Sequence, residues 1–221
     1  MFRRFPTPPA TTLAVLCAAA GAGFLGLLPG LAGARDPVTV LGWATLVAPA
    51  LGALCGSTRV AFFPFALAVP AAWGLALVLA QAGATRPLTG AHWALCALAG
   101  LFALGFAWGR RARAPLGGAG MVLLVTLALA AAPVGGGLLA GGAELARAGH
   151  PEAAAALVEL SPLVWVFDCA GWDWTHAQGD VYRRAGVEWF QRRSSAGNLA
   201  GPGVLVVGCA LAILVRARNE P

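Results

Sequence analysis

Six long stretches of this sequence carry no charged residue in their middle, and no other feature limits the possible folds as strongly. They are Thr11–Leu31, Val38–Leu54, Val60–Gln81, Gly90–Gly109, Gly120–Gly142 and Leu199–Val215. An apolar run of about 18 residues or more is long enough to cross a bilayer as a helix. Charged residues make up only 11% of the 221 residues, against about a quarter in a soluble domain. We therefore expect an all-α, polytopic integral membrane protein with about six transmembrane helices.

The character of the chain changes at about residue 144. Residues 144–198 hold seven of the nine acidic residues and four of the eight tryptophans. This composition predicts an elaborated segment outside the membrane, with short interfacial or re-entrant helices. The expected organisation is a five-helix transmembrane region over residues 1–143, an outer periplasmic or extracellular segment over 144–198, and a last helix with a short cytoplasmic tail over 199–221.

The first run has a second interpretation. Phe2-Arg3-Arg4 precedes it and Ala32-Gly33-Ala34 follows it, so it could be a signal peptide with a small-residue cleavage site. At about 20 residues it is longer than the usual apolar core of a signal peptide. We expect a retained first helix.

The arginines in the short loops indicate the orientation, because cytoplasmic loops carry the excess of positive charge. With the N-terminus inside, the outer short loops hold only Arg35 and Arg86. The long segment adds five outer arginines, but long segments constrain topology less. We expect a multi-pass protein of the cell inner membrane with both termini cytoplasmic. The inner side then holds Arg3, Arg4, Arg59, Arg110, Arg111, Arg113, Arg216 and Arg218.

Several function classes lack their required residues. The chain contains no lysine, so it has neither a Walker A phosphate loop nor a Schiff-base amine. Any ATPase that powers it must be another chain. Ion-coupled carriers need charged groups at membrane depth, and none lies in mid-run. Hydrolase and zinc-protease motifs are missing too, so we expect no enzyme, no cofactor and no nucleic-acid binding.

The five cysteines form no CxxC pair, and four lie inside apolar runs. This pattern favours small buried apolar side chains over a disulfide framework or a zinc ribbon. Glycines at 21, 23 and 26 in the first run, and between 135 and 142 in the fifth, are expected to permit close approach of helices. Proline at 64 and 70 predicts kinks in the third helix.

The outer segment is read in three parts. The alanine-rich stretch from Pro151 is helix-prone and is interrupted at Ser161-Pro162, and residues 153–167 are expected to dip into the membrane and return. Residues 168–180 combine tryptophans with polar groups. Val181 to Arg193 is basic and amphipathic, which is typical of a helix on the membrane surface.

Candidate functional residues concentrate in the same segment. Asp173, His176 and Asp180 have the spacing of one helical face and are candidate metal ligands. The alternatives are an interfacial loop, with tryptophans at headgroup depth, and a recognition surface. For an outer gate or a partner-docking surface the candidates are Trp165, Trp172, Asp173, Trp174, His176, Tyr182, Arg183, Arg184 and Trp189.

The layout resembles that of ABC-2 type transporter permeases, which have six helices, both termini inside, and a long last outer loop with interrupted helices. The step Leu160-Ser161-Pro162-Leu163 is similar to one often found there. In that family a coupling helix between the second and third spans docks on the ATPase, whereas here that loop is only Gly56 to Arg59. The resemblance implies a separate ATPase subunit. Two hypotheses for its contact are the inner loop around Arg110, Arg111 and Arg113, and a partner chain.

The leading expectation is a permease-like subunit that works in a homo- or hetero-oligomer and moves a hydrophobic or amphipathic substrate between uncharged helices. The alternative is a non-catalytic accessory subunit of a larger membrane complex, with the outer segment docking a partner. A metal-dependent membrane enzyme that uses Asp173, His176 and Asp180 is a third interpretation.

Overall fold

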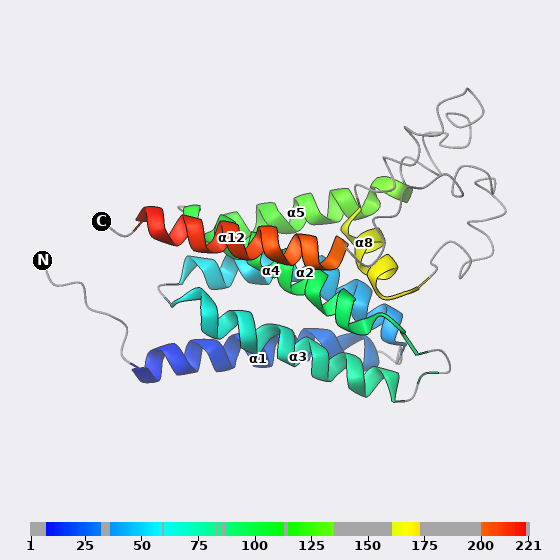
Figure 1. Ribbon diagram of the computed structural model, residues 1–221. Coiled ribbons are helices and arrows are strands. Elements are labelled where there is room, and N and C mark those ends of the chain that lie inside the picture. Colours follow the sequence, from blue (N-terminus) through cyan, green and yellow to red (C-terminus); the bar gives the residue numbers. More distant parts are fainter. Residues whose placement is uncertain are drawn as a thin grey trace, which may run out of the picture.

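The computed structural model describes residues 8–31, 36–58, 60–82, 84, 87–112, 115–134, 161–172 and 200–219, and all regular secondary structure in these ranges is helical. The helices are α1 (Pro8–Leu31), α2 (Pro37–Ser57), α3 (Phe62–Gln81), α4 (Ala91–Arg111), α5 (Pro115–Val134), α8 (Pro162–Cys169) and α12 (Ala200–Asn219). The six long helices overlap the six apolar runs, although α5 begins five residues before its run, and the all-α prediction is confirmed for the described residues (Figure 1).

Three of these helices, α2, α3 and α4, are long and apolar enough to cross a membrane. Within the described residues, the apolar stretches of α1, α5 and α12 are shorter, namely Thr11–Phe24, Gly117–Ala130 and Gly201–Val215. The described residues thus define a helical protein with at least three helices of membrane-spanning character.

Local sequence explains where two helices begin. Asp36 caps α2: its carboxylate accepts a hydrogen bond from the Val38 amide at 3.4 Å, and Pro37 occupies the first helical position. Ser161 occupies the same place before Pro162 in α8, with an extended backbone. Pro64 lies in the first turn of α3, where a missing amide hydrogen removes no helical bond, and only Pro70 is interior to that helix.

Helix α4 is the centre of the bundle, with α2 on one side and α12 on another. Gly52 and Gly56 of α2 face the backbone of α4, and Gly105 and Gly109 of α4 face the backbone of α2. These are two GxxxG motifs directed at each other. A Cβ on Gly105 would lie 2.7 Å from the carbonyl carbon of Pro49, closer than real Cβ contacts come. Close packing between helix backbones therefore holds α2 to α4.

The contact between α4 and α12 has the same character. A Cβ on Gly100 would lie 2.6 Å from the Val204 carbonyl carbon, and one on Gly208 would lie 2.5 Å from the Gly100 oxygen. The expectation of close approach in the first run is wrong for Gly21, which faces nothing within 4 Å, and for Gly23, which has only an ordinary contact with Ala72. Periodicity could not distinguish these cases, because a glycine permits close approach only where a neighbouring helix is present.

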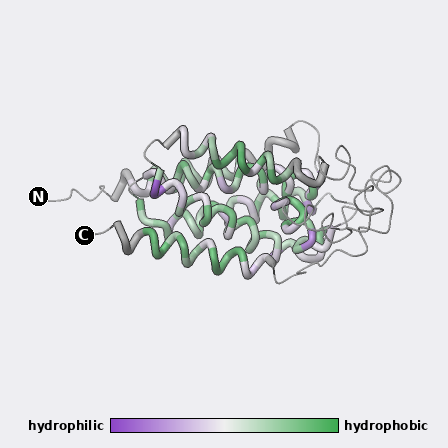
Figure 2. The backbone as a smooth tube through the Cα atoms, turned by 90° about the horizontal axis from the view of Figure 1, so that it is seen from above, coloured by the Kyte–Doolittle hydropathy of each residue, from purple (hydrophilic) through white to green (hydrophobic). Residues whose placement is uncertain are grey.

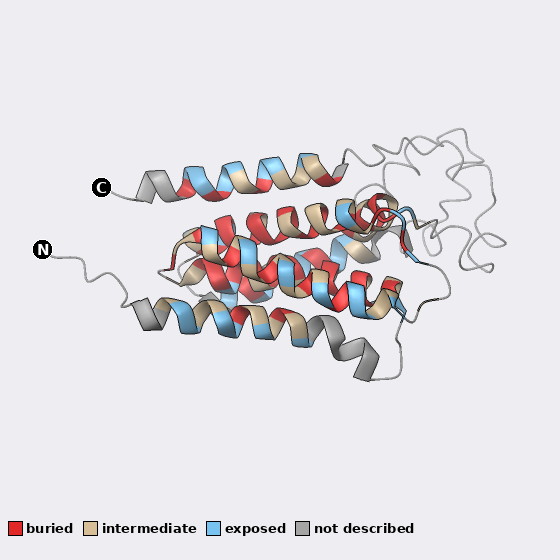
Figure 3. Cartoon of the chain, turned by 60° about the horizontal axis from the view of Figure 1, so that its bottom comes forward, coloured by how far each residue is buried: buried red, intermediate tan, exposed pale blue. Residues whose placement is uncertain are grey.

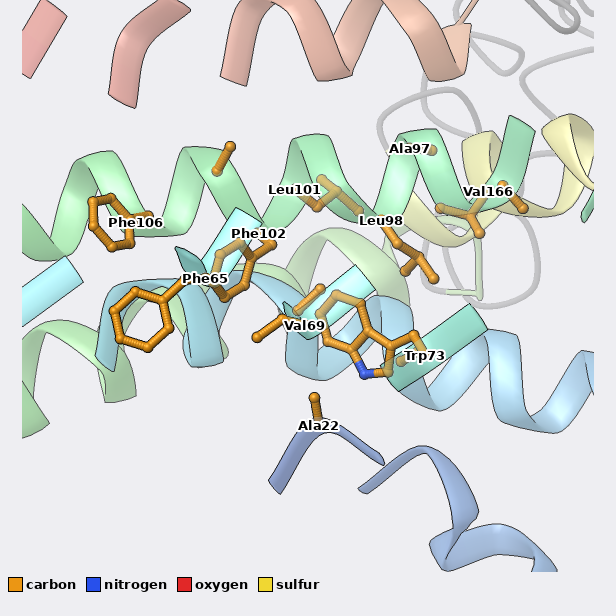
Figure 4. Close-up of a cluster of buried hydrophobic side chains, with 14 of the residues drawn as sticks. Ala22, Phe65, Val69, Trp73, Ala97, Leu98, Leu101, Phe102, Phe106 and Val166 are labelled. Carbon is orange, nitrogen blue, oxygen red and sulfur yellow. The ribbon is translucent and has the colours of Figure 1, made fainter. Parts of the chain in front are cut away.

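Aromatic side chains fill the space between α3 and α4. Trp73 packs edge-on against Phe102, with ring centroids 6.2 Å apart (Figure 4). Phe65 and Phe62 lie against Phe106. All five are buried. Aromatic pairs of this kind stabilise a fold beyond the effect of their buried area. These contacts therefore orient α3 on α4, in addition to the glycine contacts that hold α4 to α2.

The outward faces of the bundle are apolar. Figure 3 shows buried residues on the inner faces of the helices and exposed ones on the outer faces, and Figure 2 shows that the helices are hydrophobic along their length. Exposed side chains include Phe63 and Leu67 of α3, Leu124 of α5 and Val206 of α12. Contiguous apolar faces of this extent are rare on soluble monomers and suit contact with lipid.

The first and last helices place the two ends of the chain at the same end of the bundle. The start of α1 and the end of α12 lie at one end of the molecule, and α8 lies at the other (Figure 1). The turn between α2 and α3 and the end of α4 lie at the same end as the start of α1, since the long helices alternate in direction.

Candidate functional site at the α8 end of the bundle

Helix α8 packs against the ends of α2, α4, α5 and α12 rather than standing apart from the bundle. Its buried side presents Val164, Val166 and Cys169, of which Val166 and Cys169 are fully inaccessible. An eight-residue helix is too short to cross a bilayer. It packs at the end of the bundle that these helices form, and we call Pro162–Cys169 the α8 plug.

A backbone hydrogen bond ties the α8 plug to α4. The Gly90 amide, at the start of α4, donates to the carbonyl of Ala170 at 3.0 Å. Gly90 has no room for a side chain there, because a Cβ would lie 3.0 Å from the carbonyl carbons of Cys169 and Ala170. A Cβ added to Gly171 would overlap the hydroxyl oxygen of Thr89. The end of α8 is thus seated on the first turn of α4.

The plug ends in a Schellman motif. The Trp172 amide donates to the Phe167 carbonyl at 2.9 Å, the Gly171 amide donates to the Asp168 carbonyl at 3.0 Å, and Gly171 has a φ of +70°. Asp168 and Cys169 therefore belong to the helix and not to the following loop. Gly171, shortly after an apolar run, is a sequence signal for this end.

Two side chains of α8 also pack against glycines of neighbouring helices. A Cβ on Gly42 of α2 would lie 3.3 Å from the tip of the Phe167 ring, and one on Gly201 of α12 would lie 3.3 Å from the Cys169 sulfur. Burial raises the pKa of the Cys169 thiol above its ordinary value, so this cysteine is a neutral packing group. Cys55 is likewise buried, whereas Cys17 is exposed on the outer face of α1, contrary to the expectation for cysteines in the runs.

The plug brings together only part of the predicted candidate set. Trp165 and Trp172 are half-buried, and Trp172 packs against the core cluster of the bundle. Ser161 is fully buried, and its hydroxyl has no hydrogen-bond partner. Residues outside the described ranges are Asp173, Trp174, His176, Asp180, Tyr182, Arg183, Arg184 and Trp189.

The metal-site hypothesis falls on the same undescribed residues. Within the described ranges, no three histidine, cysteine, aspartate or glutamate side chains are grouped so that they could hold an ion. His92 is exposed in the first turn of α4, with its ring 4.8 Å from that of Trp93. Asp173, His176 and Asp180 remain a sequence hypothesis.

A second cluster, at the opposite end of the bundle, was missed by sequence reasoning. The Arg110 guanidinium donates to the Thr58 carbonyl at 2.7 Å and to the Val60 carbonyl, and it lies 5.1 Å from the centre of the Phe106 ring. Arg110 therefore fastens the turn between α2 and α3 to the end of α4. Its neighbour Arg111 is exposed. Loop charge predicted the side of the membrane for both, but not their different contacts.

Gly90→Ala is expected to loosen the α8 plug. The new methyl group would overlap the backbone at Cys169 and break the Gly90–Ala170 hydrogen bond. In a background with Cys169 as the only cysteine, maleimide reacts when α8 opens locally and exposes the thiol. If the substitution lowers the free energy of this opening by about 1.4 kcal/mol or more, labelling should speed up by about tenfold or more. Gly203→Ala, with nothing within 4 Å, is the matched control. Equal labelling rates would contradict the docking role.

The fold and the site define an all-helical protein with helices of membrane-spanning character and a short helix plugging one end of the bundle. Searches of family models, curated proteins and solved structures found no match to this chain.

Proposed function

We propose that the chain is a permease-like membrane subunit of an ABC-type transporter, which works with a separate ATPase and moves a hydrophobic or amphipathic substrate. The observation that carries the proposal is the α8 plug. A short helix between the fifth and sixth long helices docks at one end of the bundle, against α2, α4 and α12. In the proposed permease this helix acts as the gate of the pathway.

In this proposal all six long helices cross the inner membrane, and both termini face the cytoplasm. The start of α1 and the end of α12 share one end of the bundle, as an even number of crossings requires (Figure 1). Arg110 and Arg111 lie at that same end, in the last turn of α4, as cytoplasmic placement of positive charge favours. The α8 plug and residues 144–198 then face outward, as gate or docking surface.

The proposed ATPase contact lies at the Arg110 end. A chain without lysine cannot provide its own Walker A loop. The turn between α2 and α3 is short, and Arg110 holds it against α4, so it has no room for a coupling helix. The exposed Arg111, in the last turn of α4, is a described basic side chain at this end that could contact an acidic patch on a partner.

Affinity purification of the tagged protein in mild detergent tests the proposal. We expect a nucleotide-binding subunit to co-purify in stoichiometric amount, and Arg111→Glu to reduce its recovery severalfold by reversing the contact charge. Thr39→Glu, an exposed position at the opposite end, introduces the same acidic side chain away from the proposed contact and is the control. Purification without any ATPase would overturn the permease assignment.

One observation favours a second candidate, a non-catalytic accessory subunit of a membrane complex. The interlocked packing of α2, α4 and α12, with the pinned turn between α2 and α3, describes a rigid scaffold. In this case residues 144–198 dock a partner. Stable co-purification of other membrane proteins without an ATPase, lost when residues 173–198 are replaced by a flexible linker, would establish the accessory role.

A further inference from the structure

Trp73 carries a buried polar group that the fold leaves without a partner. The side chain is 2% exposed, and its indole N–H donates no hydrogen bond. It is the twelfth residue of a 20-residue helix, α3, well inside the apolar segment. Leaving a buried donor unpaired is costly, and such a group in a native fold calls for an explanation.

The unpaired N–H lies on the side of the ring toward α1. The indole contacts Phe102 of α4 edge-on, but in Figure 4 its nitrogen lies on the edge nearer to Ala22 of α1. Ala22 is fully buried in the same core cluster as Trp73. Helix α1 packs on α3, and the donor edge of Trp73 belongs to the buried cluster that these two helices share.

Helix α1 makes no tight backbone approach to another helix at the glycines that can be compared, Gly21 and Gly23. It packs on α3 and α2, at the margin of the bundle. Its side chains at that contact are small, as at Ala18 and Ala22, and neither Gly21 nor Gly23 makes a close backbone approach. Moving α1 away from α3 breaks no interhelical contact like those at Gly105 or Gly100.

From these observations we infer that Trp73 is the hydrogen-bond donor of a binding site between α1 and α3, which opens when α1 moves aside. Its ligand is an apolar or amphipathic molecule with an acceptor oxygen, such as an ester or amide carbonyl, at hydrocarbon depth. The aromatic ring supplies apolar contact and the N–H fixes the position of the acceptor. This inference specifies the substrate class of the proposed permease and rests on that proposal.

Two pyrene probes of equal length, one a fatty methyl ester and one the matching hydrocarbon, test the site. Full-length protein in nanodiscs of ether-linked phosphatidylcholine is titrated with each, and energy transfer from tryptophan is the signal. We expect the ester to bind about fivefold more tightly, since one net hydrogen bond is worth about that factor. Trp73→Phe should abolish the preference, and Trp108→Phe, exposed at the far end of α4, should keep it.

The lipid composition distinguishes the two sources of the acceptor. If the ester preference survives in ester-linked phosphatidylcholine, the site selects a guest molecule over bulk lipid. If it disappears there, bilayer lipid carbonyls occupy the site. Both results support the donor role. A wild-type protein without ester preference in ether-linked lipid, or a Trp73→Phe protein that keeps it, would overturn the inference.

A measurement on the wild-type protein alone guards against misfolding of the variant. The ester probe, but not the hydrocarbon, should shift the indole hydrogen-bond band in the ultraviolet resonance Raman spectrum, and an unchanged band would contradict the site. Failure of the permease proposal has a separate signature. In that case the ester preference persists while no ATPase co-purifies.

Discussion

Gly105→Ala is expected to lower the free energy of unfolding by about 2–3 kcal/mol, the upper part of the range for overpacked cores. The added methyl group would meet the carbonyl carbon and Cα of Pro49 at 2.7 and 2.9 Å. These are backbone atoms of α2, so no rotamer change can remove the overlap. The two helices must separate, which also weakens the approaches at Gly52, Gly56 and Gly109. Denaturation in mild detergent, followed by helical circular dichroism, measures the loss.

Gly120→Ala is the matched control. Gly120 lies on α5 with nothing within 4 Å, so alanine should leave stability unchanged or raise it by up to about 1 kcal/mol through helix propensity. The double variant Gly52→Ala with Gly105→Ala should lose less than the sum of the two single losses, because helices that one methyl group has separated accommodate the second. Equal effects at Gly105 and Gly120 would refute the packing of α2 on α4.

Arg110→Ala is expected to have the second large effect, a loss of about 2–4 kcal/mol. The guanidinium donates to the Thr58 carbonyl at 2.7 Å and to the Val60 carbonyl, and hydrogen bonds to charged groups are worth about 1.5–3 kcal/mol each. Because both hydrogen bonds are only partly buried, their combined contribution is smaller than twice this value. Without Arg110 the turn between α2 and α3 should also become sensitive to protease added from the side that we propose to be cytoplasmic, which immunoblotting of inverted vesicles would detect.

Arg111→Ala separates this role from a simple change of charge. Arg111 is the next residue and is exposed, so its removal alters the positive charge of the loop equally. We expect a stability change within about 0.5 kcal/mol, as for surface substitutions. Arg110→Lys should restore only part of the loss, since an ammonium group cannot present the planar fork that reaches two carbonyls. If both alanine variants behave alike, Arg110 acts through charge alone.

The position of the α8 plug could be predicted only in part from sequence. Ser161-Pro162 correctly indicates where its helix begins, because proline suits the first helical position and the preceding residue favours an extended backbone. Gly171 also marks its end, although Asp168 and Cys169 look like part of the polar loop. The seat of the plug on Gly42, Gly90 and Gly201 depends on three separate helices, and no local pattern contains that information.

The same contrast holds for the whole chain. The sequence by itself determined that the protein is helical, where its long helices run, and that their outward faces are apolar, because hydrophobicity and helix limits depend on neighbouring residues. The tertiary structure alone decided that α4 is central, that Gly105 and not Gly21 is a contact point, and that Arg110 and Arg111 differ. Such properties arise where segments far apart in the chain meet, and a residue type permits a contact without specifying its partner.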